Sequence, residues 1–171
     1  MNIRLGKYKG KLLKRSDDVY SVMLEILLRG NLHQRRKEHF WVMGLDDYNE
    51  LRYVNLVAYG ASNRVIIEPR DIFGPAFTAE ANRLVLVHNH PSGSLVPSAK
   101  DVALTRKYYD LGKELHVEIA DHYIITEEGY INLADHIRAT QAPPLSGLAY
   151  NKKWEQERQR YSRKRKGRRH Q

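Results

Sequence analysis

The stretch from Leu84 to Asp101 constrains the fold of this 171-residue chain more than any other segment. Its apolar beginning, residues 84–87, has the composition of a buried β-strand. The sequence HNHPSG follows at residues 88–93, and a helical pattern begins near Ser98. The chain must therefore place the end of a buried strand, a tight loop and the start of a helix next to one another.

The polar residues of this stretch have the spacing of a metal site. Side chains two residues apart on a strand point to the same face, so His88 and His90 can reach one ion. Asp101, in the first turn of the following helix, can supply a third ligand. Two imidazoles and one carboxylate with an open fourth position are the ligand set of a catalytic zinc site. We therefore predict that His88, His90 and Asp101 bind one Zn²⁺.

Two features of the sequence have more than one interpretation. Ser98 and Asp101 have the spacing of a capping box, which by itself does no more than begin a helix. The pair Asp121-His122 can support the metal ligands from behind, if the Asp holds the His. It can equally form a structural hydrogen bond between strands. The sequence leaves these alternatives open.

Cysteine content and charge bound the class of protein. The chain has no Cys, which excludes disulfides and Cys-based zinc sites. Of its net charge of +9, residues 1–15 contribute six Lys/Arg and no acid, and residues 151–171 contribute ten Lys/Arg and two Glu. Residues 16–150 carry 13 bases and 18 acids. The basic ends predict either a polyanionic partner such as nucleic acid or solubilising, disordered tails.

The pattern along the chain predicts one α/β domain between basic ends. No apolar run approaches ~18 residues and no signal-peptide core follows Met1, so we expect a cytoplasmic protein without a membrane span. We expect a mobile basic arm at 1–15, a domain at 16–138, and a linker with a basic tail at 139–171. Helices are predicted at 16–29, 69–82 and 99–114, and strands at 39–45, 51–59, 65–67, 84–87, 117–120, 123–126 and 130–133.

At this point the residues resemble a known family. Glu38, followed by His88-x-His90 and Ser98-x-x-Asp101, is similar to the pattern of the JAMM (MPN+) metallopeptidases. The motif HNHPSG resembles that of the RadC branch, and so do Glu38-His39-Phe40 before it and Asp121-His122 after it. The resemblance covers roughly residues 16–137. The resemblance implies a JAB1/MPN-like α/β (α+β) fold, with a mostly antiparallel sheet flanked by helices, and a single zinc ion.

Departures from the wider family point to the same branch. Asn89 stands where the eukaryotic JAMM deubiquitinases have Ser or Thr, which favours RadC over a ubiquitin hydrolase. The sequence also differs from the commoner family pattern at Gly60-Ala61, Glu68-Pro69-Arg70 and Ser94. None of these departures removes a predicted metal ligand.

The resemblance also implies catalytic roles. Glu38 would act as general base and return the proton to the leaving amine, although without the resemblance it reads as a surface Glu that begins a strand. Ser98 would donate a hydrogen bond to the tetrahedral oxyanion. Together with the zinc ligands, these groups suit hydrolysis of an amide or isopeptide bond in an unknown protein or peptide-conjugate substrate.

Two other functions compete with this hypothesis. The chain can be a nucleic-acid-associated RadC-like protein of DNA repair or mobile elements, which binds DNA through residues 1–15 and 151–171. It can also be a domain that binds protein chains without cutting them. The intact ligand set argues against the last of these, because degenerate relatives of that kind usually lack ligands.

Overall fold

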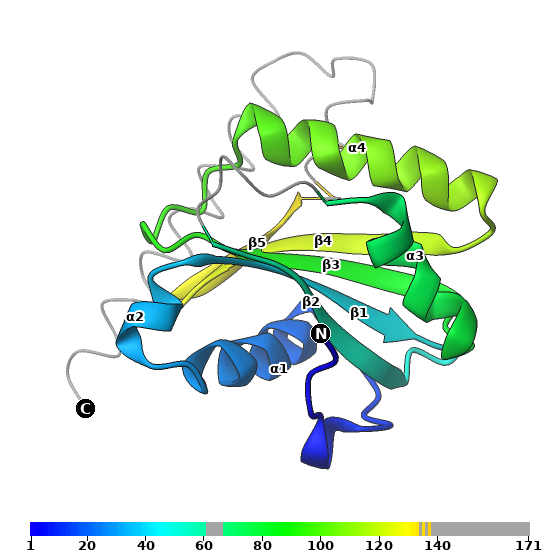
Figure 1. The fold of residues 1–171 in the computed structure, drawn as a ribbon, viewed down its shortest axis with the longest axis horizontal. Helices are drawn as coiled ribbons and strands as arrows, with labels where there is room; N and C mark the ends of the chain where they lie inside the picture. The colour runs from blue at the N-terminus through cyan, green and yellow to red at the C-terminus, as the bar shows by residue number, and fades with distance from the viewer. Residues whose placement is uncertain (61–66, 134, 136, 138–171) are drawn as a thin grey trace. The chain divides into compact units, whose positions relative to one another are not determined.

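A five-stranded sheet forms the centre of the fold in the computed structural model, which describes residues 1–60, 67–133, 135 and 137 (Figure 1). The strands lie in the order β2-β1-β3-β4-β5. The helices are η1 (Gly6–Tyr8), α1 (Ser16–Leu28), α2 (Leu32–Arg35), α3 (Pro69–Thr78) and α4 (Ala99–Glu114). The strands are β1 (Glu38–Leu45), β2 (Leu51–Gly60), β3 (Arg83–Asn89), β4 (Glu118–Thr126) and β5 (Gly129–Asn132).

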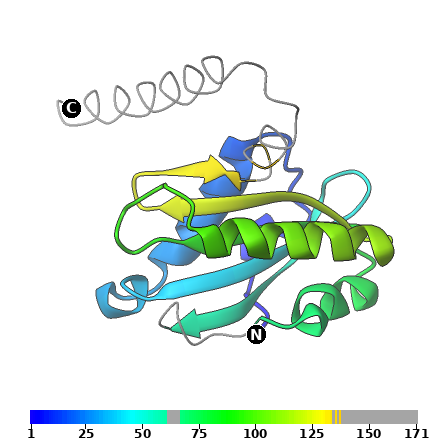
Figure 2. The same cartoon turned by 90° about the horizontal axis from the view of Figure 1, so that it is seen from above.

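The sheet is mixed but mostly antiparallel, as expected for this α/β class. Strand β1 pairs antiparallel with both β2 and β3, and β4 pairs antiparallel with β5. Only β3 and β4 are parallel, and α4 connects them. A parallel pair needs such a crossover, because its strands start at the same edge of the sheet. Helix α4 therefore begins at the sheet edge where β3 ends, and runs back along β4 (Figure 2).

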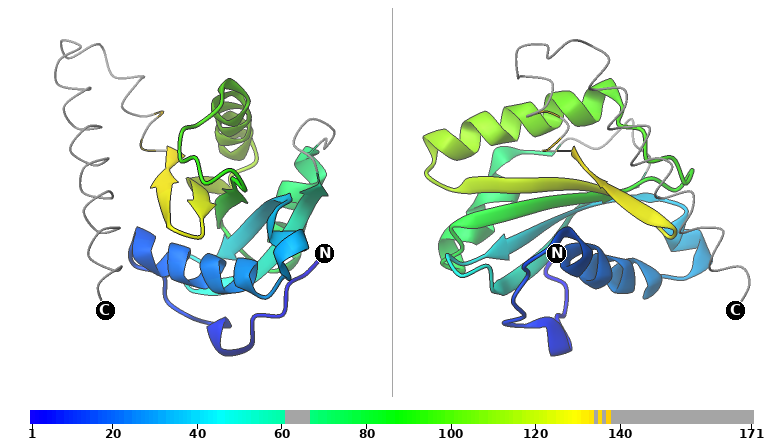
Figure 3. Two further views of the ribbon diagram at one scale, coloured as in Figure 1. Left: turned by 90° about the vertical axis from the view of Figure 1, so that its left-hand side faces the viewer. Right: turned by 180° about the vertical axis from the view of Figure 1, so that it is seen from behind.

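Alternation along the central strands divides the core into two layers. Trp41, Met43, Val85 and Val87 pack in one cluster with α1. The intervening residues of β1 and β3 pack in a second cluster with α3 and α4; these are Phe40, Val42, Leu84 and Leu86. An end-on view shows α1 on one face of the sheet and α4 on the other (Figure 3). Even-numbered positions of β1 and β3 therefore face α4, and this face is also that of Glu38 and His88.

The prediction that residues 1–15 form a mobile arm is wrong. Backbone hydrogen bonds join it to the outer edge of β2, among them Ile3 N–H to the Val54 oxygen at 2.8 Å. Leu5, Tyr8 and Leu13 are buried in the same cluster as α1. Lys and Arg residues surround these three apolar residues, so the segment does not have the pattern of a buried one. Pairing with a strand some fifty positions away also leaves no local signal in the sequence.

Other boundaries also differ from the expectations. Helix α3 ends at Thr78 rather than near 82, and Glu80 beyond it has a positive φ of 53°. The strands predicted at 117–120 and 123–126 are one strand, β4, because the polar pair between them is satisfied within the sheet. Helix α2 was not predicted. The strand expected at 65–67 lies largely outside the described residues.

Among the helices of the described segments, none combines the length and apolarity that crossing a bilayer requires.

Gly112 provides a test of how closely α4 approaches β4. A Cβ added there would lie 2.5 Å from the Val117 oxygen and 3.2 Å from Ile119. Helix propensity alone makes Gly112→Ala stabilising by ~1 kcal/mol. We expect the backbone overlap to outweigh this gain, so that the substitution lowers the free energy of unfolding by ~1–3 kcal/mol in urea denaturation.

A control in the same helix isolates the overlap. Ala103→Gly at the exposed face should cost only the propensity difference of ~1 kcal/mol. A stabilised Gly112→Ala variant would contradict the close approach.

Candidate metal centre

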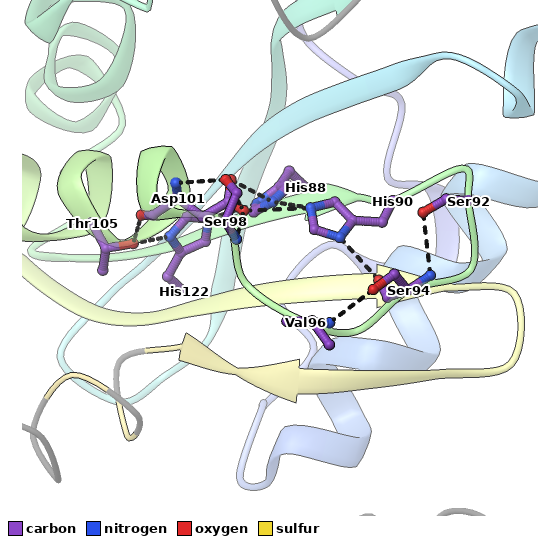
Figure 4. Close-up of polar contacts among 9 residues, drawn as sticks. All are labelled: His88, His90, Ser92, Ser94, Val96, Ser98, Asp101, Thr105 and His122. Atoms are coloured by element: carbon purple, nitrogen blue, oxygen red, sulfur yellow. Dashed lines mark hydrogen bonds and ion pairs between the residues drawn. The ribbon is translucent and has the colours of Figure 1, made fainter.

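Three predicted metal ligands meet where β3 ends and α4 begins (Figure 4). His88 is the penultimate residue of β3, His90 follows the strand directly, and Asp101 lies in the first turn of α4. One ligand atom from each residue can be chosen so that all three lie within 4.8 Å of one another. The structure therefore brings together the two imidazoles and the carboxylate that the sequence spacing singled out.

The separations match those of a four-coordinate cation. His88 Nε2 lies 3.1 Å from His90 Nε2 and 3.2 Å from Asp101 Oδ1. His90 Nε2 lies 3.5 Å from Asp101 Oδ2. Tetrahedral bonds of ~2.0–2.1 Å to nitrogen and oxygen place neighbouring ligand atoms ~3.3 Å apart. The three side chains therefore surround a space of the size that such an ion fills.

The hydrogen bond behind His90 fixes where its ring carries a proton. His90 Nδ1 lies 2.9 Å from the backbone oxygen of Ser94, in the loop between β3 and α4. A carbonyl oxygen can only accept, so Nδ1 must carry the hydrogen. In the neutral ring, Nε2 is then a bare lone pair. That lone pair is directed at His88 and Asp101.

A chain of hydrogen bonds fixes His88 in the same way. The Thr105 hydroxyl donates its single hydrogen to the backbone oxygen of Asp101, so it must accept from Nδ1 of His122 at 2.6 Å. His122 Nε2 is then an acceptor, and it receives the hydrogen of His88 Nδ1 at 2.9 Å. His88 Nε2 is left as a lone pair. Burial lowers the pKa of the His122 imidazole well below its usual value, which keeps this ring neutral.

Three proton acceptors thus converge without a hydrogen between them. Two imidazole lone pairs and a carboxylate repel one another unless a cation or a proton lies between them. Without a metal, a proton on one of the rings takes the place of the cation. Burial by itself raises the pKa of the Asp101 carboxyl, but hydrogen bonds from protonated His88 or His90 outweigh it and hold that pKa well below its usual value. The Asp101 carboxylate likewise raises the pKa of the His90 imidazole, because it stabilises the protonated ring. The donor set therefore fits a metal ion that takes nitrogen and oxygen ligands.

Asp121 and His122 lie on opposite faces of β4. His122 supports the predicted metal ligand His88 from behind, as the first interpretation of this pair proposed. Asp121 does not hold it, because neighbouring residues of a strand point in opposite directions. Asp121 instead accepts from Asn132 Nδ2 at 2.8 Å and from the Tyr123 hydroxyl at 3.4 Å.

Sequence reasoning missed Thr105, which takes the place expected of Asp121. A signal for it was present in the sequence. Positions 98, 101 and 105 recur at the spacing that places side chains on one face of a helix.

Ser98 begins α4 and forms the predicted capping box with Asp101. Its hydroxyl accepts from the Asp101 backbone N–H at 3.2 Å and donates to Asp101 Oδ2 at 2.7 Å. The hydrogen expected to serve an oxyanion is therefore directed at a metal-ligand oxygen. The oxyanion role of Ser98 stays a prediction, and it requires that hydrogen to turn toward a substrate.

Glu38 begins β1 on the face of the sheet that carries His88. Phe40, two residues further along β1, is paired with His88 and lies against its ring, with centroids 6.0 Å apart. Glu38 itself lies two residues beyond the last β1–β3 pair. The charge of Glu38 also makes a small contribution to the raised pKa of His90. Glu38 is half-buried and lies on the same face of the sheet as His88, and its catalytic role stays a prediction.

Thr105 allows a test of the hydrogen-bond chain behind His88. Thr105→Val keeps the shape but leaves His122 Nδ1–H without an acceptor, so His88 loses its fixed orientation. We expect the affinity for Zn²⁺, measured by competition with a chromophoric chelator, to fall about 10–100-fold. Thr105→Ser, which restores the hydroxyl, should recover most of it. Equal affinities in all three proteins would contradict the chain.

Comparison with known proteins finds related sequences. A UPF0758 protein of Syntrophomonas wolfei is 36% identical over 123 residues, which are 72% of this chain and 52% of that protein. A UPF0758 protein of Methanosarcina barkeri is 34% identical over 118 residues, 69% of this chain and 49% of that protein. The chain spans about half the length of the curated relatives it matches. A sequence model described as RadC-like JAB domain matches residues 13–138, and the chain therefore belongs to the RadC-like JAB domain family.

Proposed function

We propose that this protein is a zinc-dependent hydrolase of amide or isopeptide bonds, of the JAMM metallopeptidase type. The observation that supports this most is the convergence of two imidazole lone pairs and the Asp101 carboxylate, with every proton of the His88 and His90 rings directed away from the centre. A closed structural site would use a fourth protein ligand, whereas these three leave a position open. Within the described residues, no fourth His, Cys, Asp or Glu joins the cluster.

The chain's own residues divide the chemistry among them. His88 Nε2, His90 Nε2 and an Asp101 carboxylate oxygen would hold the ion. A bound Zn²⁺ supplies Lewis acidity and lowers the pKa of a coordinated water toward ~7. Glu38 accepts a proton at its carboxylate and returns it to the leaving nitrogen. Ser98, once its hydroxyl turns from Asp101, donates a hydrogen bond to the oxygen that becomes negative during the reaction.

Metal content and one conservative variant test this proposal. Purified protein should contain about one zinc per chain, and His88→Ala should lose it because two ligands cannot retain the ion. Glu38→Gln should retain zinc but lower the hydrolysis of peptide and isopeptide substrates ~10²–10⁴-fold, because an amide cannot accept the proton.

Two exposed residues provide matched controls. His33→Ala on α2 should keep the metal, and Glu114→Gln at the end of α4 should keep activity. Zinc retained by His88→Ala would refute the proposed ligands. Native turnover in Glu38→Gln would remove Glu38 from the mechanism while leaving the metal site in place.

A second candidate function is nucleic-acid binding through the basic ends, which the exposed side chains of Arg4, Lys9 and Lys14 favour within the described arm. Phosphate contacts release counterions, so affinity for duplex DNA or RNA should fall steeply between ~50 and ~200 mM salt. Deleting residues 151–171 should abolish this binding and spare the zinc. Binding that is absent from the full chain, or that survives the deletion, would count against a role for the tail.

A further inference from the structure

Asn89 lies between the two imidazole ligands but contributes nothing to the metal cluster. It is the last residue of β3 and only 2% exposed. Its Oδ1 accepts the backbone N–H of His39 at 2.7 Å, and its Nδ2 donates to the backbone oxygen of Lys37 at 3.0 Å. These two backbone groups are the ones on either side of Glu38.

The amide replaces hydrogen bonds that the sheet gives up at this point. The β1–β3 ladder runs from Leu45 and Arg83 to Phe40 and His88, and ends there. Beyond it, β3 stays paired with β4, because the His90 N–H continues the β3–β4 ladder by donating to the Ile125 oxygen at 3.0 Å. The end of the β1–β3 ladder leaves the Lys37 oxygen and the His39 N–H in need of other partners, because backbone groups removed from water must be paired.

A primary amide suits this place because it offers one donor and one acceptor side by side. A carboxylate would keep the acceptor for His39 and lose the donor for Lys37. A hydroxyl is too short to reach both groups. The His39 ring adds a second contact, because its Nδ1 donates to the same Lys37 oxygen at 2.9 Å while the ring stacks on Trp41.

We infer that Asn89 is a positioning residue for Glu38: by holding the backbone on both sides of Glu38, it fixes the direction of that carboxylate toward the metal centre. This inference rests on the proposed function, in which Glu38 is the general base. It explains why a buried amide lies between the two metal ligands: Asn89 serves the base, Glu38, and not the metal ion. A misplacement of about 1 Å is enough to impair a catalytic group.

The test measures the position of the Glu38 carboxyl relative to the metal without any substrate. The protein is labelled with ¹³C at Glu carboxyl groups and loaded with Co²⁺, whose unpaired electrons shift nearby nuclei. Glu38→Gln assigns the Glu38 signal. We expect a strong paramagnetic shift for Glu38 in the native protein and a loss of at least half of it in Asn89→Ser. The shifted ring N–H signals of His88 and His90 should stay unchanged, whereas a general loss of structure would move them as well.

The matched control is Asn82→Ser, an exposed Asn just before the other end of β3, which should leave every signal in place. A Glu38 shift that is unchanged in Asn89→Ser would overturn this inference and leave the proposed function standing. No shift of Glu38 in the native protein would instead overturn the role of Glu38 itself. Should Asn89→Ser not fold, Asn89→Thr replaces it. Loss of cobalt from whichever variant folds would also overturn the inference, because the inference assigns Asn89 no part in holding the metal.

Discussion

The placement of protons behind the two histidines is the constraint on which the rest of this site depends. A carbonyl oxygen behind His90 and a His122–Thr105 chain behind His88 take the Nδ1 hydrogens of both rings. Both Nε2 lone pairs are then directed at the space shared with the Asp101 carboxylate. Such an arrangement is costly for the protein alone, and it becomes favourable when a cation is bound.

The fold provides each of these parts at one edge of the sheet. Strand alternation puts His88 and Glu38 on the face covered by α4, and the β3–α4–β4 crossover brings the start of α4 to the end of β3. In the parallel β3–β4 pair, His122 is opposite Leu86, two residues before His88 on the same face, and its ring reaches His88 Nδ1 at 2.9 Å. The β1–β3 ladder ends at the same edge, and there Asn89 binds the backbone groups that flank Glu38. The end of the β1–β3 ladder and the supports of the site therefore lie at the same place in the fold.

The sequence predicted those parts of the site that depend on local spacing. His88 and His90 on a strand, and Ser98 with Asp101 at a helix start, follow from periods of two and of one helical turn. Long-range partners were not predictable in the same way. The edge pairing that orders residues 1–15 depends on β2, some fifty residues away, and the Lys and Arg residues obscured the apolar anchors. Asp121 does not hold His122, because neighbouring residues of β4 lie on opposite faces; it forms instead the hydrogen bond between strands that was the alternative interpretation.

Zinc K-edge anomalous diffraction from crystals of the zinc-loaded protein tests the central claim most directly. The proton placement predicts one peak per chain, bonded at ~2.0–2.1 Å to Nε2 of His88, Nε2 of His90 and a carboxylate oxygen of Asp101. Nδ1 of both rings should remain hydrogen-bonded to His122 and to the Ser94 oxygen. No peak at this position, or a zinc ion held through Nδ1 or by His122, would contradict the account.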